Sequence, residues 1–381
     1  MRLLPTLTGP LLVCFSLLVG GVATPPAAAA SAVSCVETNL PVSVPTPREI
    51  VHGQLCIPAG SAPTTVQLLV HGGPYNRVYW DFPYQPERYS YQRDMASHGY
   101  ATFAIDRLGT GESTKPPSVT LLDNVEAASI HQVIGHLRAG RVGGMRFDRV
   151  VLVGHSLGSG VTIREAATYH DVDGVILTGM THLVSALTVT KIFTMSVQPV
   201  TLDPQLRHRG SDPGYITTIP GRREPLFYST SDADPSVIAT DEATKDQTSA
   251  LGVGTIILFD FLGPTSRGIN VPVLLAVGEK DAIFCGFLAR DCSSADALRK
   301  QEAPYFSPAA ELSTYVLPGS GHSIALHKNA GDYREATRDW LSARFGTGRQ
   351  NVSSAVTGSS IPKLLPRTPI CSVKAVYGSL T

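Results

Sequence analysis

From residue 65 onward, short apolar segments alternate with segments of helical periodicity, and this alternation most constrains the fold. The predicted strands are nearly continuous runs of Val, Leu and Ile at 65–70, 101–105, 150–153, 174–178, 271–277 and 313–317. Helices are predicted at 87–97, from a capping box at Thr120 and Asp123 to about residue 137, from the end of the third strand to about 169, and at 332–344. Strands that lack polar alternation are buried on both faces. The pattern therefore predicts an α/β fold, with a mostly parallel central sheet and helices on both of its faces.

Residues 183–268 interrupt this alternation. Their apolar ends flank a polar middle that contains Pro and Gly. An insertion between two core strands is expected over the carboxyl ends of the strands, where ligands bind in such sheets. We interpret the segment as a cap, and a peripheral excursion without a role in binding is the alternative.

A nucleotide-binding doubly wound sheet is a second interpretation of the same pattern. That fold needs a glycine-rich turn after the first strand and an acidic residue about twenty positions further on. Residues 106–111 read Asp-Arg-Leu-Gly-Thr-Gly, so the acid precedes the glycines. The sequence therefore disfavours a dinucleotide site.

The charge composition argues against two classes of partner. The chain of 381 residues carries 31 basic and 31 acidic side chains, for a formal net charge of zero. A balanced charge gives no electrostatic reason to expect binding to nucleic acid or to an anionic membrane surface. The length and apolar content instead suit one large domain or two small ones, and we place a single domain at 33–347.

The first 32 residues read as a secretory signal peptide. A basic residue at position 2 precedes a mostly apolar stretch at 11–22, and small residues follow at Ala30 and Ala32. A stretch of twelve residues is too short for a helix that crosses the membrane, which needs about 20. We therefore expect a secreted protein without stable membrane insertion. The tail at 348–381 is rich in Ser and Pro and is predicted to be irregular.

Cysteine usage agrees with an oxidising compartment. After removal of Cys14 with the signal peptide, five cysteines remain, at positions 35, 56, 285, 292 and 371. Cys285 and Cys292 can pair locally, and Cys35 and Cys56 can join the first two strands, which leaves Cys371 single. No Cys-x-x-Cys pair or cysteine–histidine cluster has zinc spacing, so no metal site is predicted.

A candidate nucleophile lies in the five residues Gly-His-Ser-Leu-Gly at 154–158. The pattern Gly-x-Ser-x-Gly is weak by itself, but here it follows a predicted buried strand directly and opens a predicted helix. The sharp turn gives the serine strained dihedrals, and glycines two residues away on either side remove colliding side chains. Ser156 is therefore the candidate nucleophile. An ordinary strand-to-helix turn with a capping serine is the alternative.

A serine hydroxyl needs a base, and the base needs an acid that fixes its tautomer. His322 follows the last strand and is the candidate base. Asp281 follows the preceding predicted strand and is the candidate acid, with Glu279 second. The other histidines considered are less suitable: His327 lies further along the chain, His155 is held beside the nucleophile, and His131 and His136 are expected to be solvated on a surface helix.

Two backbone N–H groups are candidates for an oxyanion hole. Leu157 follows the nucleophile at a helix start, and Gly73 lies in the loop His-Gly-Gly-Pro at 71–74. Tyr75 and Trp80 follow this loop, and with Tyr79, Phe82 and the apolar cap they suggest a hydrophobic substrate pocket. Packing of these aromatic residues against the loop is nearly as good an explanation.

Together, these motifs resemble the α/β-hydrolase superfamily over about residues 45–347. They are His-Gly-Gly-Pro at 71–74, Asp-Arg-x-Gly-x-Gly-x-Ser at 106–113, Gly-x-Ser-x-Gly at 154–158, Gly-x-x-Asp at 278–281 and Gly-His at 321–322. The resemblance implies the order Ser156, Asp281, His322, with oxyanion donors at Gly73 and Leu157. One departure is the distance of 41 residues from acid to base. Another is Tyr75, where the related proline iminopeptidases carry glycine.

The expected activity is hydrolysis of a small-molecule carboxylic ester through an acyl-enzyme intermediate, with no cofactor. An amidase or exopeptidase acting on an amide, a lipase, and a non-catalytic binding protein on the same scaffold remain alternatives. The sequence leaves the natural substrate and the oligomeric state open.

Overall fold

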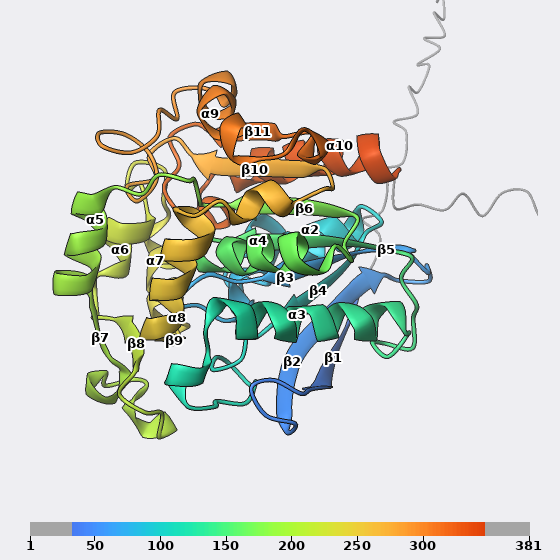
Figure 1. Ribbon diagram of the computed structural model, residues 1–381, viewed down its shortest axis with the longest axis horizontal. Helices are drawn as coiled ribbons and strands as arrows, with labels where there is room; N and C mark the ends of the chain where they lie inside the picture. Colours follow the sequence, from blue (N-terminus) through green and yellow to red (C-terminus); the bar gives the residue numbers. More distant parts are fainter. Residues whose placement is uncertain (1–32, 347–381) are drawn as a thin grey trace, which may run out of the picture.

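The computed structural model describes residues 33–346. The predicted signal peptide at 1–32 and the tail at 348–381 lie outside these residues, and so do Cys14 and Cys371. A single eight-stranded sheet forms the centre of the described part, and helices cover both of its faces (Figure 1). The predicted α/β architecture is confirmed.

The central sheet has the strand order β1-β2-β4-β3-β5-β6-β10-β11. Its strands are β1 (Val33–Val42), β2 (Glu49–Pro58), β3 (Thr65–Val70), β4 (Ala101–Ile105), β5 (Arg149–His155), β6 (Gly174–Thr178), β10 (Val273–Gly278) and β11 (Ser313–Leu317). β2 runs antiparallel to both β1 and β4, and the five other pairs are parallel. From β3 to β10 every strand residue of this sheet except Arg149 is buried, as expected for a sheet covered on both faces.

Helices connect these strands. The longer ones are α2 (Tyr91–Ser97), α3 (Asp123–Arg138), α4 (Leu157–Tyr169), α9 (Ala295–Glu302) and α10 (Ala330–Phe345), and α1 (Pro86–Tyr89) is a single turn. The short helical turns outside residues 183–268 are η1 (Arg77–Tyr79), η2 (Ser118–Thr120), η8 (Ala303–Tyr305), η9 (Pro308–Ala310) and η10 (Ile324–Leu326), and η7 (Thr265–Gly268) ends that segment.

The starts of two helices differ from the prediction. The helix predicted over 87–97 is split at Ser90, whose hydroxyl caps α2 by accepting a hydrogen bond from the Arg93 N–H at 3.0 Å. The capping box at Thr120 and Asp123 is wrong, because Leu122 occupies the cap position of α3. The first N–H of α3, that of Asp123, instead donates to the Thr255 hydroxyl at 3.1 Å. A tertiary contact thus replaces the local cap.

The cap, residues 183–268, is inserted between β6 and β10. It contains α5 (Ala186–Lys191), η3 (Ile192–Ser196), β7 (Val197–Pro199), η4 (Val200–Leu202), η5 (Arg207–Arg209), β8 (Tyr215–Thr218), α6 (Arg223–Phe227), α7 (Pro235–Ala243), β9 (Thr248–Ser249), α8 (Ala250–Thr255) and η6 (Ile256–Phe261). β7, β8 and β9 form a small antiparallel sheet. Figure 1 shows these elements gathered at one end of the central sheet.

A buried arginine, held by an ion pair within the cap, connects the cap to the sheet domain. The guanidinium of Arg223 pairs with the carboxylate of Asp241 at 2.8 Å, and both side chains are buried. Its Nη1 also donates to the main-chain oxygen of Pro74 at 3.1 Å. Breaking a buried pair on one side leaves an uncompensated charge, so this contact fixes the cap on the loop that follows β3.

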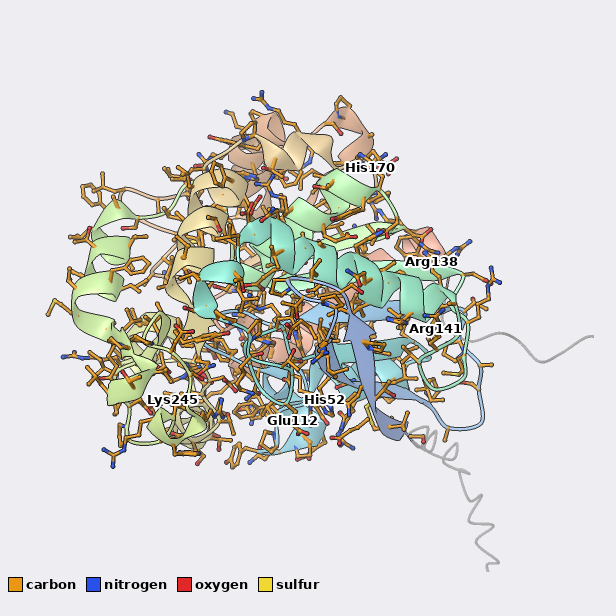
Figure 2. All side chains as sticks on the ribbon, turned by 60° about the horizontal axis from the view of Figure 1, so that its bottom comes forward. His52, Glu112, Arg138, Arg141, His170 and Lys245 are labelled. Atoms are coloured by element: carbon orange, nitrogen blue, oxygen red, sulfur yellow. A yellow bond between two sulfur atoms is a disulfide. The ribbon has the colours of Figure 1, made fainter. Side chains whose placement is uncertain are left out.

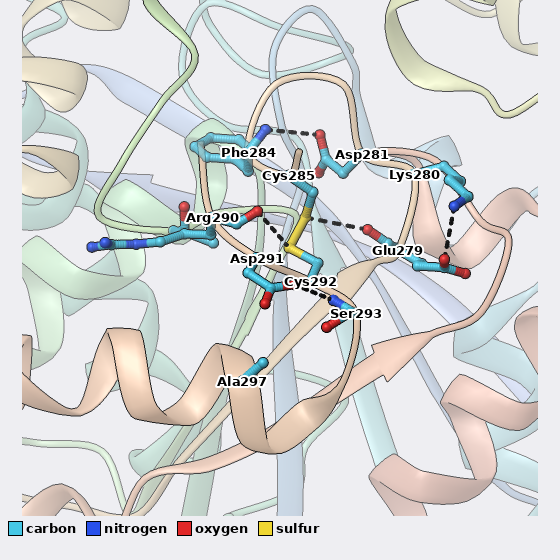
Figure 3. The surroundings of a disulfide bond; sticks show 12 residues. Glu279, Lys280, Asp281, Phe284, Cys285, Arg290, Asp291, Cys292, Ser293 and Ala297 are labelled. Carbon is cyan, nitrogen blue, oxygen red and sulfur yellow. Dashed lines mark hydrogen bonds and ion pairs between the residues drawn. A yellow bond between two sulfur atoms is a disulfide. The ribbon is translucent and has the colours of Figure 1, made fainter. Parts of the chain in front are cut away.

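Both predicted disulfides are present. Cys35 and Cys56 are directly opposite each other on β1 and β2 and are bonded. Cys285 and Cys292 close the loop after β10 (Figure 3). Within residues 33–346, no helix combines the length and apolarity needed to span a bilayer.

Candidate active site

Ser156 occupies a strained turn between β5 and α4. Its dihedrals are φ 52° and ψ −121°, outside the regions that L-residues normally adopt. The Ser156 N–H donates to the main-chain oxygen of Thr178 on β6 at 2.8 Å, which holds the turn against the sheet. The structure thus has the sharp strand-to-helix turn that is expected around a candidate nucleophile.

The two glycines of the Gly-x-Ser-x-Gly pattern are required by close contacts. A Cβ atom on Gly154 would lie 2.6 Å from the main-chain oxygen of Gly158. A Cβ atom on Gly158 would lie 2.3 Å from the main-chain oxygen of Val70 on β3. Neither backbone can yield, so the motif is a packing requirement of the turn.

His322 and Asp281 are hydrogen-bonded to each other. The imidazole Nδ1 lies 2.8 Å from the carboxylate Oδ2, and both side chains are buried. The other carboxylate oxygen, Oδ1, accepts hydrogen bonds from the N–H groups of Ile283 at 2.9 Å and Phe284 at 3.3 Å (Figure 3). These two donors fix the carboxylate so that Oδ2 faces the histidine.

The second imidazole nitrogen of His322 is available for chemistry. Among the described residues, no atom forms a hydrogen bond with Nε2. The ring packs between Phe227 and Phe284, with centroid distances of 5.5 and 5.8 Å. Both phenyl rings line the same pocket as Ser156. The structure therefore brings the imidazole and the serine into one apolar environment. Hydrogen bonds between nucleophile and base commonly tighten only when substrate binds.

The second candidate acid, Glu279, faces away from His322. Its carboxylate pairs with Lys280 at 2.7 Å and accepts a hydrogen bond from the Gly319 N–H at 2.8 Å. These two hydrogen bonds hold the pKa of Glu279 below its ordinary value. The hydrogen bond to Gly319 shapes the turn that precedes His322, in the segment we call the histidine loop (residues 318–323). No hydrogen bond joins Glu279 to the His322 imidazole among the described residues.

His327 supports the loop of His322 and is not positioned as a base. Its Nε2 accepts hydrogen bonds from the N–H groups of Gly321 at 2.9 Å and Ser229 at 3.1 Å. Burial lowers its pKa, which keeps this nitrogen unprotonated and able to accept. It thus joins the cap to the histidine loop.

The remaining histidines considered lie elsewhere. His155 stacks on Tyr79 at 4.3 Å, and burial holds its pKa well below the ordinary value. His131 is partly exposed on α3, in line with the prediction that solvent reaches it. His136 is buried, so the prediction that it is solvated is wrong. Its Nε2 is 2.8 Å from the main-chain oxygen of Pro41, because β1 crosses this end of α3.

The two candidate oxyanion donors, Gly73 and Leu157, lie beside Ser156 in the lining of the pocket. Leu157 is the first residue of α4, where the backbone N–H has no intrahelical partner. A Cβ on Gly73 would lie 2.5 Å from Leu157 Cδ1, so glycine allows the two segments to approach.

A buried histidine orients the loop of Gly73, a role that sequence reasoning did not assign. His71 Nδ1 donates to the main-chain oxygen of Gly72 at 2.7 Å, and its Nε2 accepts from the N–H of Arg107 at 3.1 Å. Burial holds the pKa of His71 well below the ordinary value, and the charge of Arg107 lowers it further. A neutral ring with the proton on Nδ1 satisfies both hydrogen bonds.

An apolar pocket opens over Ser156. Gly73, Leu157 and Ser156 lie together in its wall, and the cap supplies most of the rest. The other lining residues are Pro74, Val184, Val189, Ile192, Phe193, Val197, Ile216, Thr218, Leu226, Phe227, Thr248, Val253, Ile257, Phe261, Ile283 and Phe284. Sequence reasoning missed these side chains individually, because apolar cap residues form no motif.

Tyr75 and Trp80, predicted to bind substrate, do not line this pocket. Both are buried. The Tyr75 hydroxyl is 2.7 Å from the Ser323 hydroxyl, and the guanidinium of Arg223 lies over its ring at 4.2 Å. Trp80 packs edge-on against Tyr91 behind the loop. These rings hold the oxyanion loop, the cap and the histidine loop together.

A second serine–histidine–carboxylate arrangement exists away from the pocket. Ser266 Oγ lies 2.8 Å from His182 Nε2, and His182 Nδ1 lies 2.6 Å from Glu302 Oε2. All three side chains are buried, and the Ser266 hydroxyl is also 2.7 Å from the main-chain oxygen of Tyr305. Because none of them lines the pocket over Ser156, this network packs the cap and cannot meet substrate there.

Comparison with known proteins places the chain in a family. A sequence model of the Alpha/beta hydrolase family matches residues 67–336, more than half of the chain. No curated protein sequence matches it. Similar solved structures include a thermophilic esterase from Thermogutta terrifontis, at 20% identity, TM-score 0.55 and coverage of 81% of this chain and 98% of that one.

Two further structures share the fold. A putative aryl esterase from Burkholderia cenocepacia is 17% identical with a TM-score of 0.55, and it covers 81% of this chain and 99% of its own. A soluble variant of monoglyceride lipase from Saccharomyces cerevisiae is 16% identical with a TM-score of 0.53, with 81% and 94% covered. The chain belongs to the Alpha/beta hydrolase family.

Proposed function

We propose that the protein is a serine hydrolase that cleaves carboxylic esters of apolar acids. The single observation that carries the proposal is the state of His322. Its Nδ1 is bound to Asp281, while no described residue forms a hydrogen bond with its Nε2, which lies in the apolar shell around the Ser156 pocket. An imidazole oriented in this way is ready to accept a proton from a serine.

In the proposed mechanism, Ser156 Oγ attacks the ester carbonyl carbon while His322 Nε2 takes the hydroxyl proton. Asp281 holds the imidazole by Nδ1 and stabilises the imidazolium. The tetrahedral intermediate then expels the alcohol, which receives the proton from Nε2. Water repeats these steps on the acyl-enzyme, with Nε2 as base, and releases the acid.

The N–H groups of Gly73 and Leu157 are the proposed donors to the oxyanion. Their position beside Ser156 in the pocket wall supports this role. A preorganised backbone donor of this kind stabilises the transition state by about 3–4 kcal/mol. The hydrogen bonds of His71 support the role by keeping the loop of Gly73 in place.

The composition of the pocket supports an apolar acyl group as the part of the substrate that binds there. Aside from Ser156, Thr218 and Thr248, the side chains that line it are apolar. No charged side chain among them would recognise a free amine or a carboxylate, which disfavours exopeptidase activity. The esterases and the lipase with the same fold agree with this choice of reaction.

The proposal is tested by labelling with a fluorophosphonate and by turnover of p-nitrophenyl esters. We expect stoichiometric labelling of Ser156, seen by peptide mass spectrometry, and loss of labelling and turnover in Ser156→Ala. Ser266→Ala is the matched control, because Ser266 also contacts a histidine that binds a carboxylate. Retained turnover in Ser156→Ala, or loss in a folded Ser266→Ala protein, would refute the assignment.

We also propose that the protein is exported. The two disulfides fit an oxidising compartment, and the predicted signal peptide precedes the described residues. Mass spectrometry of the protein recovered from the medium of an expressing cell should find an N-terminus near residue 33. A protein that stays in the cell with residues 1–32 attached would contradict the proposal.

A further inference from the structure

Three potential metal ligands meet where α3, α4 and the loop before β6 come together, and none of them lines the pocket over Ser156. His131 comes from α3, Glu165 from α4, and Asp171 from the loop between α4 and β6. One ligand atom from each lies within 4.8 Å of the others. His131 Nδ1 and Asp171 Oδ2 are 2.7 Å apart. Figure 2 labels Arg138, which binds the main-chain oxygen of Asp171, and His170, which precedes Asp171 in the chain.

Glu165 is an unusual member of this cluster because it is fully buried with a second carboxyl group, that of Asp171, beside it. Its exposed fraction is 0%, and no donor among the described residues satisfies either of its carboxylate oxygens. Asp171 Oδ1 likewise has no such donor, and the two carboxyl groups lie within hydrogen-bond reach of each other. Burial, followed by the neighbouring Asp171, raises the pKa of Glu165 to about 10. A carboxylate in this environment needs either a proton or a cation.

Two neighbouring side chains border the cluster. Tyr169 stacks on the His131 ring at 4.0 Å. The nearby guanidinium of Arg138 binds the main-chain oxygen of Asp171 at 2.6 Å and the carboxylate of Asp173 at 2.9 Å. Its hydrogen bonds go to these other groups, and its charge lowers the pKa of Glu165 without offsetting the effect of burial.

We propose that His131, Glu165 and Asp171 bind a divalent transition-metal ion, for which Zn²⁺ fits best. One imidazole and two carboxylates are a donor set that zinc accepts, whereas calcium takes six to eight oxygen ligands. Tetrahedral zinc at about 2.0–2.2 Å from each ligand separates the ligand atoms by about 3.3 Å. The half-exposed His131 side chain, 43% exposed, can rotate to reach this spacing. Water would complete the coordination.

The consequence of binding is structural. The ion would join α3 to the C-terminal part of α4 and to the loop that leads into β6. Ser156 is the N-cap residue at the opposite end of α4. It would also neutralise the buried carboxylate. Metal binding at this site does not depend on the proposed ester hydrolysis, so either proposal can fail without the other.

The test is isothermal titration of ZnCl₂ into the full chain, prepared without a histidine tag and treated with EDTA. We expect one site per chain, with affinity at least tenfold lower in Glu165→Gln and His131→Ala. His98→Ala is the matched control, because exposed His98 pairs with Asp94 at 3.1 Å in a similar contact outside this cluster. Its affinity for zinc should be unchanged.

A thermal melt gives a second readout. Saturating Zn²⁺ should raise the melting temperature of the parent chain by about 2 °C or more and leave that of Glu165→Gln unchanged. The glutamine keeps the volume of the side chain without a charge, so the metal-free variant should be folded. Absent stoichiometric binding, equal affinity in Glu165→Gln, loss of affinity in His98→Ala, or tighter binding of Ca²⁺ than Zn²⁺ would each overturn the proposal.

Discussion

Replacement of Asp281 by Asn tests how the acid controls His322. In the native site, Oδ1 accepts two backbone hydrogen bonds, from Ile283 and Phe284, and Oδ2 faces His322 Nδ1. The asparagine oxygen must take the place of Oδ1, because the two N–H groups there require an acceptor. Its NH₂ group then points at Nδ1, which has to become an acceptor. The ring proton moves to Nε2, where it prevents Nε2 from taking the proton of Ser156.

The size of the effect follows from these hydrogen bonds. Flipping the amide would leave the two buried N–H groups unsatisfied, at about 1–3 kcal/mol each. A total of about 2 kcal/mol already restricts the flipped form to roughly one molecule in 30. Activity should therefore fall at least about 30-fold. The full expected loss in kcat is about 10⁴-fold, or about 5.5 kcal/mol, the effect of the wrong tautomer in a serine triad.

The assay is kcat and KM for a p-nitrophenyl ester, with the fold checked by circular dichroism. We expect kcat to fall while KM stays within about threefold, since Asp281 does not line the pocket. Glu279→Gln is the matched control at the end of the same strand and should keep kcat within twofold. A loss smaller than tenfold in Asp281→Asn would refute this account of the tautomer.

Three further changes have defined outcomes. Gly158→Ala places a Cβ 2.3 Å from the Val70 oxygen, so thermal melts should show a decrease of about 2–6 °C, and an unchanged melting temperature would contradict the contact. Burial raises the pKa of Asp260 to about 7, so folded-state protonation contributes stability that is lost as pH rises from about 4 through 7. Asp260→Asn should therefore melt about 2 °C or more above the parent at pH 8 and equal to it at pH 4, and equal melting at both values would refute the shift. Ile192 lines the pocket, and each buried CH₂ is worth about fourfold in kcat/KM. Ile192→Trp should remove this gain for longer acyl chains, measured across p-nitrophenyl esters, and an unchanged chain-length profile would exclude acyl binding there.

The features that sequence predicted well are local. Continuous apolar strands identify the parallel sheet because burial on both faces leaves no polar alternation. The Gly-x-Ser-x-Gly turn is equally local, since the two glycines are required within five residues. The pairing of Asp281 with His322 could be anticipated because parallel strands deliver their carboxyl ends to one edge. The separation of 41 residues in the sequence does not prevent this pairing.

Other features depend on side-chain direction or on distant contacts. Tyr75 and Trp80 follow the oxyanion loop, yet their position does not reveal that their rings turn into the core. The α3 cap comes from Thr255, which is 132 residues away. The cluster around Glu165 likewise forms across two helices and a loop, so no spacing of residues in the sequence predicts it. Packing of the cap decides which of its apolar residues line the pocket.

The most direct test of the central claim is a crystal structure of the phosphonate adduct. We predict a covalent bond from Ser156 Oγ to phosphorus. One phosphoryl oxygen should lie about 2.7–3.1 Å from the nitrogen atoms of both Gly73 and Leu157, with His322 Nε2 within hydrogen-bond distance of Oγ. An adduct on another residue, or an oxygen turned away from both nitrogen atoms, would contradict it.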